Sequence, residues 1–212
     1  MIKQFTFNHF EVNCYLIIDN ATMKCAIVDP TCEASFEDAQ LTQYIDNMSL
    51  KVAMILLTHA HVDHVAGLRQ VCQHYNLPVI MHKDGRKFLR QAEAYGSVMG
   101  FAVDNLGDLE VSEINDGDVL HLGETEIECR YVPGHCPGSI CYVLPADKAV
   151  ITGDALFHFS IGRTDLPGGD YPTLIDSIKR RLMTLPDDYH ILPGHGIASQ
   201  VGKERKYNSF LI

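Results

Sequence analysis

The sequence of 212 residues predicts a mixed α/β or α+β fold, and three observations support this prediction. Apolar runs of strand length, such as 52–57, alternate with helix-length stretches in the first half of the chain. The segment after residue 35 repeats its apolar residues at helical spacing, at Leu41, Tyr44, Ile45 and Met48. From residue 111 onwards short apolar strands separated by Gly, Asp and Pro predominate. The length fits one domain spanning 1–212.

The first half is expected to begin with three strands at 2–7, 14–18 and 25–29, with a turn at 19–22. The helix that follows opens on a stretch that resembles a capping box, Ser35-Phe36-Glu37-Asp38. A strand at 52–57, a helix from about 63 to 75 and a strand at 77–81 come next. This alternation predicts a sheet with helices packed outside it.

Residues 84–110 give the weakest pattern. We expect a helix over 84–94 and a mobile loop over 95–107, which either covers a site or is a surface excursion. Strands are then predicted at 118–122, 125–132, 139–144 and 148–152. A helix starts near 170, where Pro172 takes an early position that tolerates it, and a last strand at 188–192 and a last helix at 199–206 follow.

Composition excludes several classes of protein. The formal charge of −10 argues against nucleic-acid binding, and no apolar run approaches the ~20 residues of a membrane span. The N-terminus alternates like a strand and lacks the apolar core of a signal peptide, so we expect a cytoplasmic protein. The seven cysteines form no CxxC pair, which favours reduced thiols. Cys136 either fills a tight turn or has a redox or supporting role beside His135.

A dense group of metal-ligand residues follows the strand at 52–57. His59, His61 and Asp63 are spaced two residues apart, so in an extended segment their side chains share one face, and His64 opens the next helix. Metal sites need neutral imidazoles and carboxylates that converge on one point. This stretch is therefore predicted to bind metal at the carboxyl end of a strand.

Three distant stretches share the form of an apolar strand followed by a turn with a ligand residue. They are Gly134-His135, Gly153-Asp154 and Gly194-His195. In each, glycine lets the backbone turn sharply before the ligand. Three more strand ends thus deliver His, Asp and His.

These motifs resemble the metallo-β-lactamase superfamily. The stretches at 134–139, 153–157 and 160–169 resemble its glyoxalase II-like (hydroxyacylglutathione hydrolase-like) branch in a short single-domain form. The resemblance implies a four-layer αββα sandwich with metals at one edge of the two sheets. It also implies that His59, His61 and His135 hold one divalent ion, that Asp63, His64 and His195 hold a second, and that Asp154 bridges them. Zinc is the expected metal, and Fe or Mn also suits such ligands.

The implied activity is hydrolysis of a small anionic thioester by a metal-bridging hydroxide, which Asp63 would orient as a catalytic residue. His158 is a candidate substrate contact or an exposed residue. Arg163 either pairs with a substrate carboxylate or is a buried strut that holds its loop. The chain lacks the C-terminal basic domain of full-length glyoxalase II, and Asp165 is acidic where that family carries a Tyr. We therefore predict hydrolysis without predicting glutathione specificity.

Two other activities fit the same residues. Persulfide dioxygenases share the Gly-Arg-Thr-Asp stretch at 162–165 and would use one iron, held here by His59, His135 and Asp154. A lactonase or other ester hydrolase is the second alternative. The sequence leaves the oligomeric state open.

Overall fold

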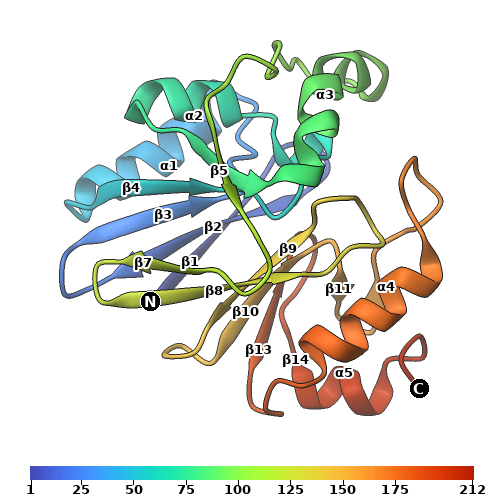
Figure 1. The fold of residues 1–212 in the computed structure, drawn as a ribbon. Helices are drawn as coiled ribbons and strands as arrows, with labels where there is room; N and C mark the ends of the chain where they lie inside the picture. Colours follow the sequence, from blue (N-terminus) through green and yellow to red (C-terminus); the bar gives the residue numbers. More distant parts are fainter.

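The computed structural model describes all 212 residues and shows two six-stranded sheets packed face to face, with helices on both outer faces (Figure 1). The first sheet runs in the order β1 (Ile2–Phe7), β2 (Val12–Asp19), β3 (Lys24–Val28), β4 (Lys51–Leu56), β5 (Val79–His82) and β6 (Val111–Ile114). The second runs in the order β14 (Ser199–Gln200), β13 (His190–Pro193), β10 (Ala149–Gly153), β9 (Ile140–Leu144), β8 (Thr125–Tyr131) and β7 (Val119–Leu122). The four-layer αββα sandwich is confirmed.

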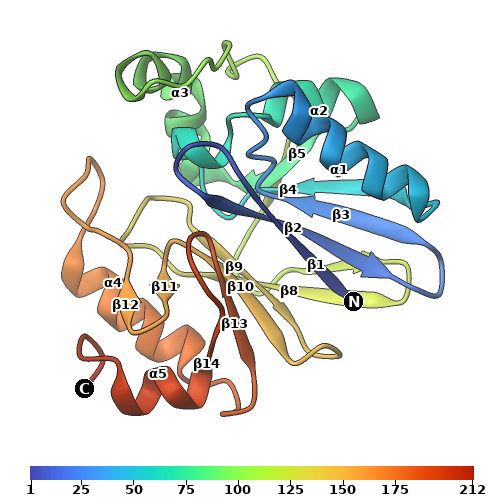
Figure 2. The same cartoon turned by 180° about the vertical axis from the view of Figure 1, so that it is seen from behind.

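Helices α1 (Ser35–Asn47), α2 (Leu68–Tyr75) and α3 (Arg86–Met99) lie on the outer side of the first sheet. Helices α4 (Tyr171–Ser177), which continues as a π-helical turn over Ile178–Leu182, and α5 (Val201–Tyr207) cover the second. A small hairpin of β11 (Leu156–Phe157) and β12 (Ser160–Ile161) is not hydrogen-bonded to either sheet, and β11 packs against β10 and β13 of the second. The reverse view shows the first sheet, with β1 to β4, stacked on the second, with β8, β9, β10 and β13 (Figure 2).

Three apolar cores separate the four layers, and β2 explains why. All eight of its residues are buried, as expected for a strand covered on both faces. Leu16 faces the core beneath α1 and α2, whereas Tyr15 and Ile17 face the core between the sheets. The third core lies between the second sheet and α4 and α5, and includes Val143, Val150, Ile191, Leu174, Ile178 and Val201.

Several predicted boundaries in the first half are wrong. Helix α1 is capped at Ala34, with Ser35 inside it, and only the Glu37 half of the capping box forms, accepting the Ala34 N–H at 3.0 Å. The helix expected from residue 63 begins at Leu68, because a 3₁₀ turn over Val62–His64 comes first. Strand β6 had not been predicted.

Helix α3 differs most from expectation. It continues to Met99, so 95–99 are helical and the expected loop is shorter. The helix passes through Gly96, where a Cβ atom would lie 3.1 Å from the Phe101 carbonyl oxygen and 3.5 Å from Val62. Glycine at this position leaves room for the Phe101 carbonyl, and the helix continues through it instead of ending.

The two sheets are tied together at one edge. Strands β3 to β6 are parallel, as are β10 and β13, so their carboxyl ends share an edge. Across it the Asn13 N–H donates to the Gly194 carbonyl at 2.7 Å, and the Ile140 N–H donates to the Thr58 carbonyl at 2.8 Å. The Tyr142 hydroxyl donates to the Leu57 carbonyl at 2.7 Å. These hydrogen bonds hold the loops that leave this edge in fixed positions relative to one another.

None of the helices combines the length and the apolar character that crossing a membrane would require.

Candidate metal centre

The loop after β4 brings four of the candidate ligands to the shared edge of the sheets. His59 lies just beyond β4, and His61 precedes the 3₁₀ turn with extended backbone angles, φ −68° and ψ 150°. Asp63 and His64 lie inside that turn, so Asp63 does not continue the extended segment as its spacing had predicted. The tight turn nevertheless places His64 beside His59 and directs Asp63 toward His195.

The second sheet supplies the other three candidates from loops after β8, β10 and β13. Gly134 and Gly153, which precede His135 and Asp154, have positive φ values of 122° and 49°, as the predicted sharp turns require. Gly194 before His195 serves a different need. A Cβ atom there would lie 2.2 Å from Asp154 Oδ1, so its lack of a side chain leaves room for that carboxylate.

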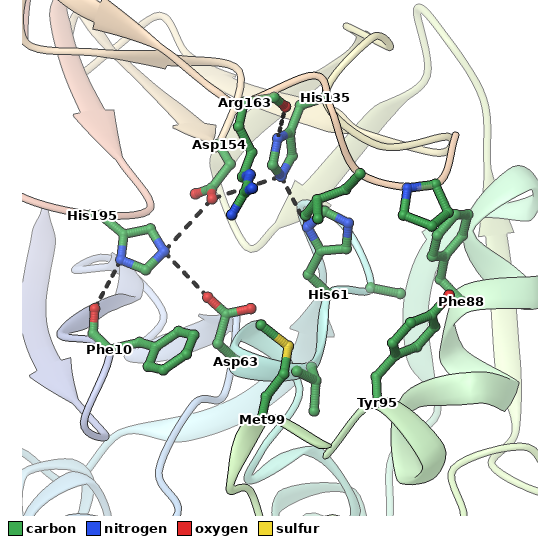
Figure 3. A pocket seen from close by; sticks show the side chains of 14 residues that line it. Phe10, His61, Asp63, Phe88, Tyr95, Met99, His135, Asp154, Arg163 and His195 are labelled. Atoms are coloured by element: carbon green, nitrogen blue, oxygen red, sulfur yellow. Dashed lines mark hydrogen bonds and ion pairs between the residues drawn. The ribbon is translucent and has the colours of Figure 1, made fainter. Parts of the chain in front are cut away.

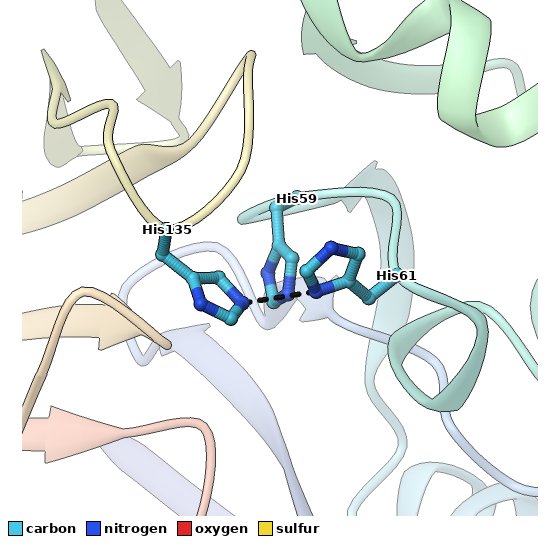
Figure 4. Close-up of side chains that lie close together, drawn as sticks. All are labelled: His59, His61 and His135. Atoms are coloured by element: carbon cyan, nitrogen blue, oxygen red, sulfur yellow. Dashed lines mark hydrogen bonds between the residues drawn. The ribbon is translucent and has the colours of Figure 1, made fainter. Parts of the chain in front are cut away.

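The seven side chains form two adjoining groups. His59, His61 and His135 each offer a ligand atom, and these atoms lie within 4.8 Å of one another (Figure 4). His135 Nε2 is 2.9 Å from His61 Nδ1. The second group, Asp63, His64 and His195, meets the same criterion of 4.8 Å.

Asp154 lies between the two groups. Its Oδ2 is 3.7 Å from His135 Nε2 and 3.6 Å from His195 Nε2, and its Oδ1 is 3.3 Å from His64 Nε2. Its carboxylate therefore faces side chains from both groups. Figure 3 shows Asp154, His195 and Asp63 around one hollow.

Each of three histidines uses its outward nitrogen in a hydrogen bond that fixes the ring. His64 Nδ1 lies 2.9 Å from Asp29 Oδ2, His135 Nδ1 lies 2.8 Å from the Arg163 carbonyl, and His195 Nδ1 lies 3.0 Å from the Phe10 carbonyl. Because these acceptors engage the Nδ1–H, the Nε2 atoms are left to face the hollow. Asp29 is the one carboxylate among these three acceptors, and it holds the ring of His64.

Several buried polar atoms in the hollow have no hydrogen-bond partner. His59 Nε2, His64 Nε2 and Asp154 Oδ1 are fully enclosed and unpaired. The His64 and Asp154 atoms are 3.3 Å apart, yet their alignment is not that of a hydrogen bond. Buried polar atoms left unsatisfied are costly, so their convergence fits a bound cation.

Burial and mutual repulsion keep His59 and His61 neutral. Burial lowers the pKa of His59 well below its usual value, and burial together with His135 lowers the pKa of His61 to about 4. Burial opposes ionisation of Asp154, but His64 outweighs it and holds the pKa of that carboxyl well below its ordinary value. Neutral imidazoles and ionised carboxylates are the forms that bind divalent metals.

A pocket of about 240 Å³ opens beside the ligands (Figure 3). His61, Asp63, His135, Asp154 and His195 form part of its wall, and apolar side chains complete much of the rest. Arg163 lines the mouth, but it is not the buried strut considered from the sequence, because its side chain is 60% exposed and paired with Asp165 at 2.7 Å. His158 does not line the pocket, and its ring packs near Phe159 instead.

Three pocket residues had not been singled out from the sequence. Phe10 lies in the turn between β1 and β2, and Tyr95 and Met99 lie in the last turns of α3. Of the two alternatives for the segment from residue 95, its first residues thus fit the one in which it borders the site. Cys136 is fully buried with a thiol pKa raised to about 12 by burial, which favours a packing role over a reactive one.

Comparisons with known proteins agree with this architecture. Residues 8–195 match the Metallo-beta-lactamase superfamily. The chain is 38% identical to hydroxyacylglutathione hydrolase GloC of Haemophilus influenzae, over 95% of this chain and 93% of the relative. Among solved structures, it is similar to the BLEG-1 B3 metallo-beta-lactamase (TM-score 0.89, 29% identity, covering 100% and 99% of the two chains). It is also similar to TTHA1623 in a di-iron-bound form (TM-score 0.88, 31% identity, 99% and 100%).

The match over most of the chain, the relative at 38% identity and the shared fold lead to one conclusion: this protein belongs to the metallo-β-lactamase superfamily.

Proposed function

We propose that the protein is a dinuclear metal-dependent hydrolase of small thioesters. The observation that carries this proposal is the pair of adjoining ligand groups with Asp154 between them. The name of the Haemophilus influenzae relative, a hydroxyacylglutathione hydrolase, supports thioester chemistry, and the di-iron form of TTHA1623 supports two metals.

In this proposal His59, His61 and His135 hold one divalent ion, Asp63, His64 and His195 hold the other, and Asp154 is shared. Zinc is our proposed metal, although a site of nitrogen and oxygen ligands also suits Fe or Mn. When bound, such ions lower the pKa of a water molecule toward neutrality and polarise a carbonyl group.

Asp63 is the proposed catalytic residue within this arrangement. It lines the pocket, and its Oδ2 lies 3.3 Å from His195 Nε2. Burial raises the pKa of its carboxyl, but His64 and His195 lower this pKa by more. The pKa therefore lies below its ordinary value, and the carboxylate stays ionised. It can accept a hydrogen bond from the attacking water and so aim it at the carbonyl carbon.

A thioester suits the remaining residues because its leaving group is undemanding. A thiol has a pKa of about 8.5, so the thiolate leaves near neutral pH without a strong general acid. The chain needs no nucleophilic serine or cysteine, and all seven of its thiols are buried.

The test combines metal analysis with a substrate panel. Protein purified without chelator is expected to hold two divalent ions per chain and to release thiol from acyl thioesters, with a lactone and a β-lactam as competing substrates. One iron per chain, together with oxygen uptake on a persulfide, would contradict the proposal and favour the dioxygenase. A preference for the lactone or the β-lactam over every thioester would contradict the substrate class while leaving the metal centre in place.

A further inference from the structure

We infer that the pocket beside the ligands binds an uncharged, apolar substituent of the scissile thioester, and that the end of α3 sets how large this substituent can be. This inference rests on the proposed hydrolase function and names the substrate class more narrowly.

The wall opposite the second ligand group is apolar. In Figure 3, Phe88 and Tyr95 lie side by side across His61 from His195. The Phe88 ring meets the His61 ring edge to face, at 6.0 Å between centroids. Leu166 and Pro167 line the pocket as well. A substituent that extends from the reacting carbonyl into this region leaves water for an apolar surface.

Charge in the pocket does not favour a charged thiol. Glutathione carries two carboxylates and an ammonium group, and each needs a partner once it leaves water. Arg163 is the only Lys or Arg in the lining, and its Nε and Nη2 donate to Asp165 at 2.7 and 2.8 Å. The lining thus offers few cationic side chains to a charged thiol, and the anionic substrate expected from the sequence stays a prediction.

The volume of the pocket limits the size of the substituent. The space of about 240 Å³ borders the candidate ligands, so the reacting carbonyl takes part of it and the substituent takes the rest. Short to medium acyl or alkyl chains suit a space of this size.

The end of α3 forms one side of the pocket. Tyr95 and Met99 lie on its last turns and line the space, with Met99 below Asp63 in Figure 3. A Cβ at Gly96, between them, would lie in ordinary contact with Val62 at 3.5 Å, so the end of α3 lies beside the metal loop. The sizes of Tyr95 and Met99 should therefore affect the chain length that fits the pocket.

The apolar substituent can lie on the acyl side or on the thiol side of the thioester, and two substrate series distinguish these positions. One varies the acyl chain from acetyl to octanoyl on N-acetylcysteamine, and the other varies the thiol from methyl to hexyl on an acetyl group. In one series kcat/KM is expected to rise about three- to fourfold per methylene until the pocket is full. S-lactoylglutathione, with its charged thiol, should fall below the best member of either series.

Variants at neighbouring positions give a matched control. Met99→Trp narrows the pocket and is expected to lower the ratio of octanoyl to acetyl turnover, or of hexyl to methyl turnover. Val98→Trp introduces the same bulky residue one position away. The Val98 side chain is 85% exposed and outside the lining, so this variant should leave the octanoyl-to-acetyl and hexyl-to-methyl ratios unchanged. Equal effects of the two variants would show that Met99 does not face the substrate.

The outcomes distinguish this inference from the proposed function. Hydrolysis of acetyl thioesters with flat kcat/KM in both series overturns the inference and leaves the function. If no thioester is hydrolysed, the function fails, and titration calorimetry with the matching acyl amides then decides the inference. Affinity that grows with chain length supports the apolar pocket, whereas binding that is absent or independent of length overturns it.

Discussion

Asp29 lies directly behind His64, with its Oδ2 2.9 Å from His64 Nδ1 and both side chains buried. The same carboxylate accepts hydrogen bonds from the Thr58 N–H at 2.7 Å and the Thr58 hydroxyl at 2.6 Å. It therefore joins the ends of β3 and β4 to one of the proposed ligands.

Replacing this carboxylate should weaken metal binding. Asp29→Asn suits the left-handed backbone at this position, where φ is 51°, because Asn tolerates that region. The amide carries no charge to hold the His64 ring, so metal affinity is expected to fall about 10- to 100-fold. Competition with a chromogenic chelator measures it. Asp19→Asn removes another buried carboxylate, one bound by Thr22 and Thr125, and should leave affinity intact.

The carboxylate between the two ligand groups should be needed for both metal content and activity. Asp154→Asn keeps the shape of the side chain but removes the charge that faces His64, His135 and His195. We expect loss of bound metal and of hydrolysis, with the far-ultraviolet circular dichroism spectrum unchanged. A fully loaded and active Asp154→Asn protein would refute the bridging role.

Removing metal should lower the melting temperature reversibly. Ions that bind only the folded chain stabilise it by about 2.7 kcal/mol when present at 100 times their dissociation constant. Without them, His59 Nε2 and Asp154 Oδ1 stay buried and unpaired. Scanning calorimetry before and after chelation, and after readdition of zinc, measures the effect. The Asp154→Asn protein should show a much smaller shift, and an equal shift in both proteins would place the bound ions elsewhere.

Adding one methyl group at residue 194 should disrupt the centre. The Cβ of Gly194→Ala would lie 2.2 Å from Asp154 Oδ1 and 2.7 Å from His64, so these side chains have to move. Overpacking of this kind costs about 1 to 3 kcal/mol, and metal affinity should fall with it. Gly117→Ala, at a positive φ but with open space around it, should lower stability without changing metal affinity. Unchanged metal affinity in Gly194→Ala would show that the ligands accommodate the added methyl group, which contradicts this prediction.

Stability should decline at alkaline pH. Burial raises the pKa of the thiols of Cys25, Cys72 and Cys129 to about 12, from an ordinary value of 9.0. The unfolded chain releases these protons first, so the stabilisation is complete below pH 9 and is lost as the pH rises toward 12. At pH 10 each such thiol lowers the free energy of unfolding by on the order of 1 kcal/mol.

The urea midpoint at pH 8 and pH 10 measures this decline. Cys129→Ala removes one of the thiols and should reduce the difference between the two midpoints. The same difference in Cys129→Ala and the unaltered protein would assign the alkaline decline to other groups.

Much of the fold could be predicted from the sequence because its central strands are covered on both faces. Continuous apolar runs such as 52–57 and 14–18 are visible without tertiary information, and β4 and β2 occur there. The metal-ligand candidates were visible for a related reason, since each follows such a strand. Their convergence is a property of strand ends that share an edge.

The parts that could not be predicted depend on contacts between distant segments. Gly96 reads locally as a helix end, but α3 continues through it, with Val62 of a distant segment 3.5 Å from where its Cβ would lie. The roles of Phe10 and Tyr95 in the pocket follow from loops that meet only after the sheets have assembled. Arg163 was ambiguous because its partner, Asp165, is an exposed neighbour whose effect on orientation has no signature in the sequence.

The seven candidate ligands are divided between the sheets: four follow β4 in the first, and three follow β8, β10 and β13 in the second. Ions held jointly by them would crosslink the two halves of the chain reversibly, in a protein whose cysteines form no disulfide. Metal supply would then govern how readily the halves separate under proteolysis or mechanical load, as well as whether the chain is active.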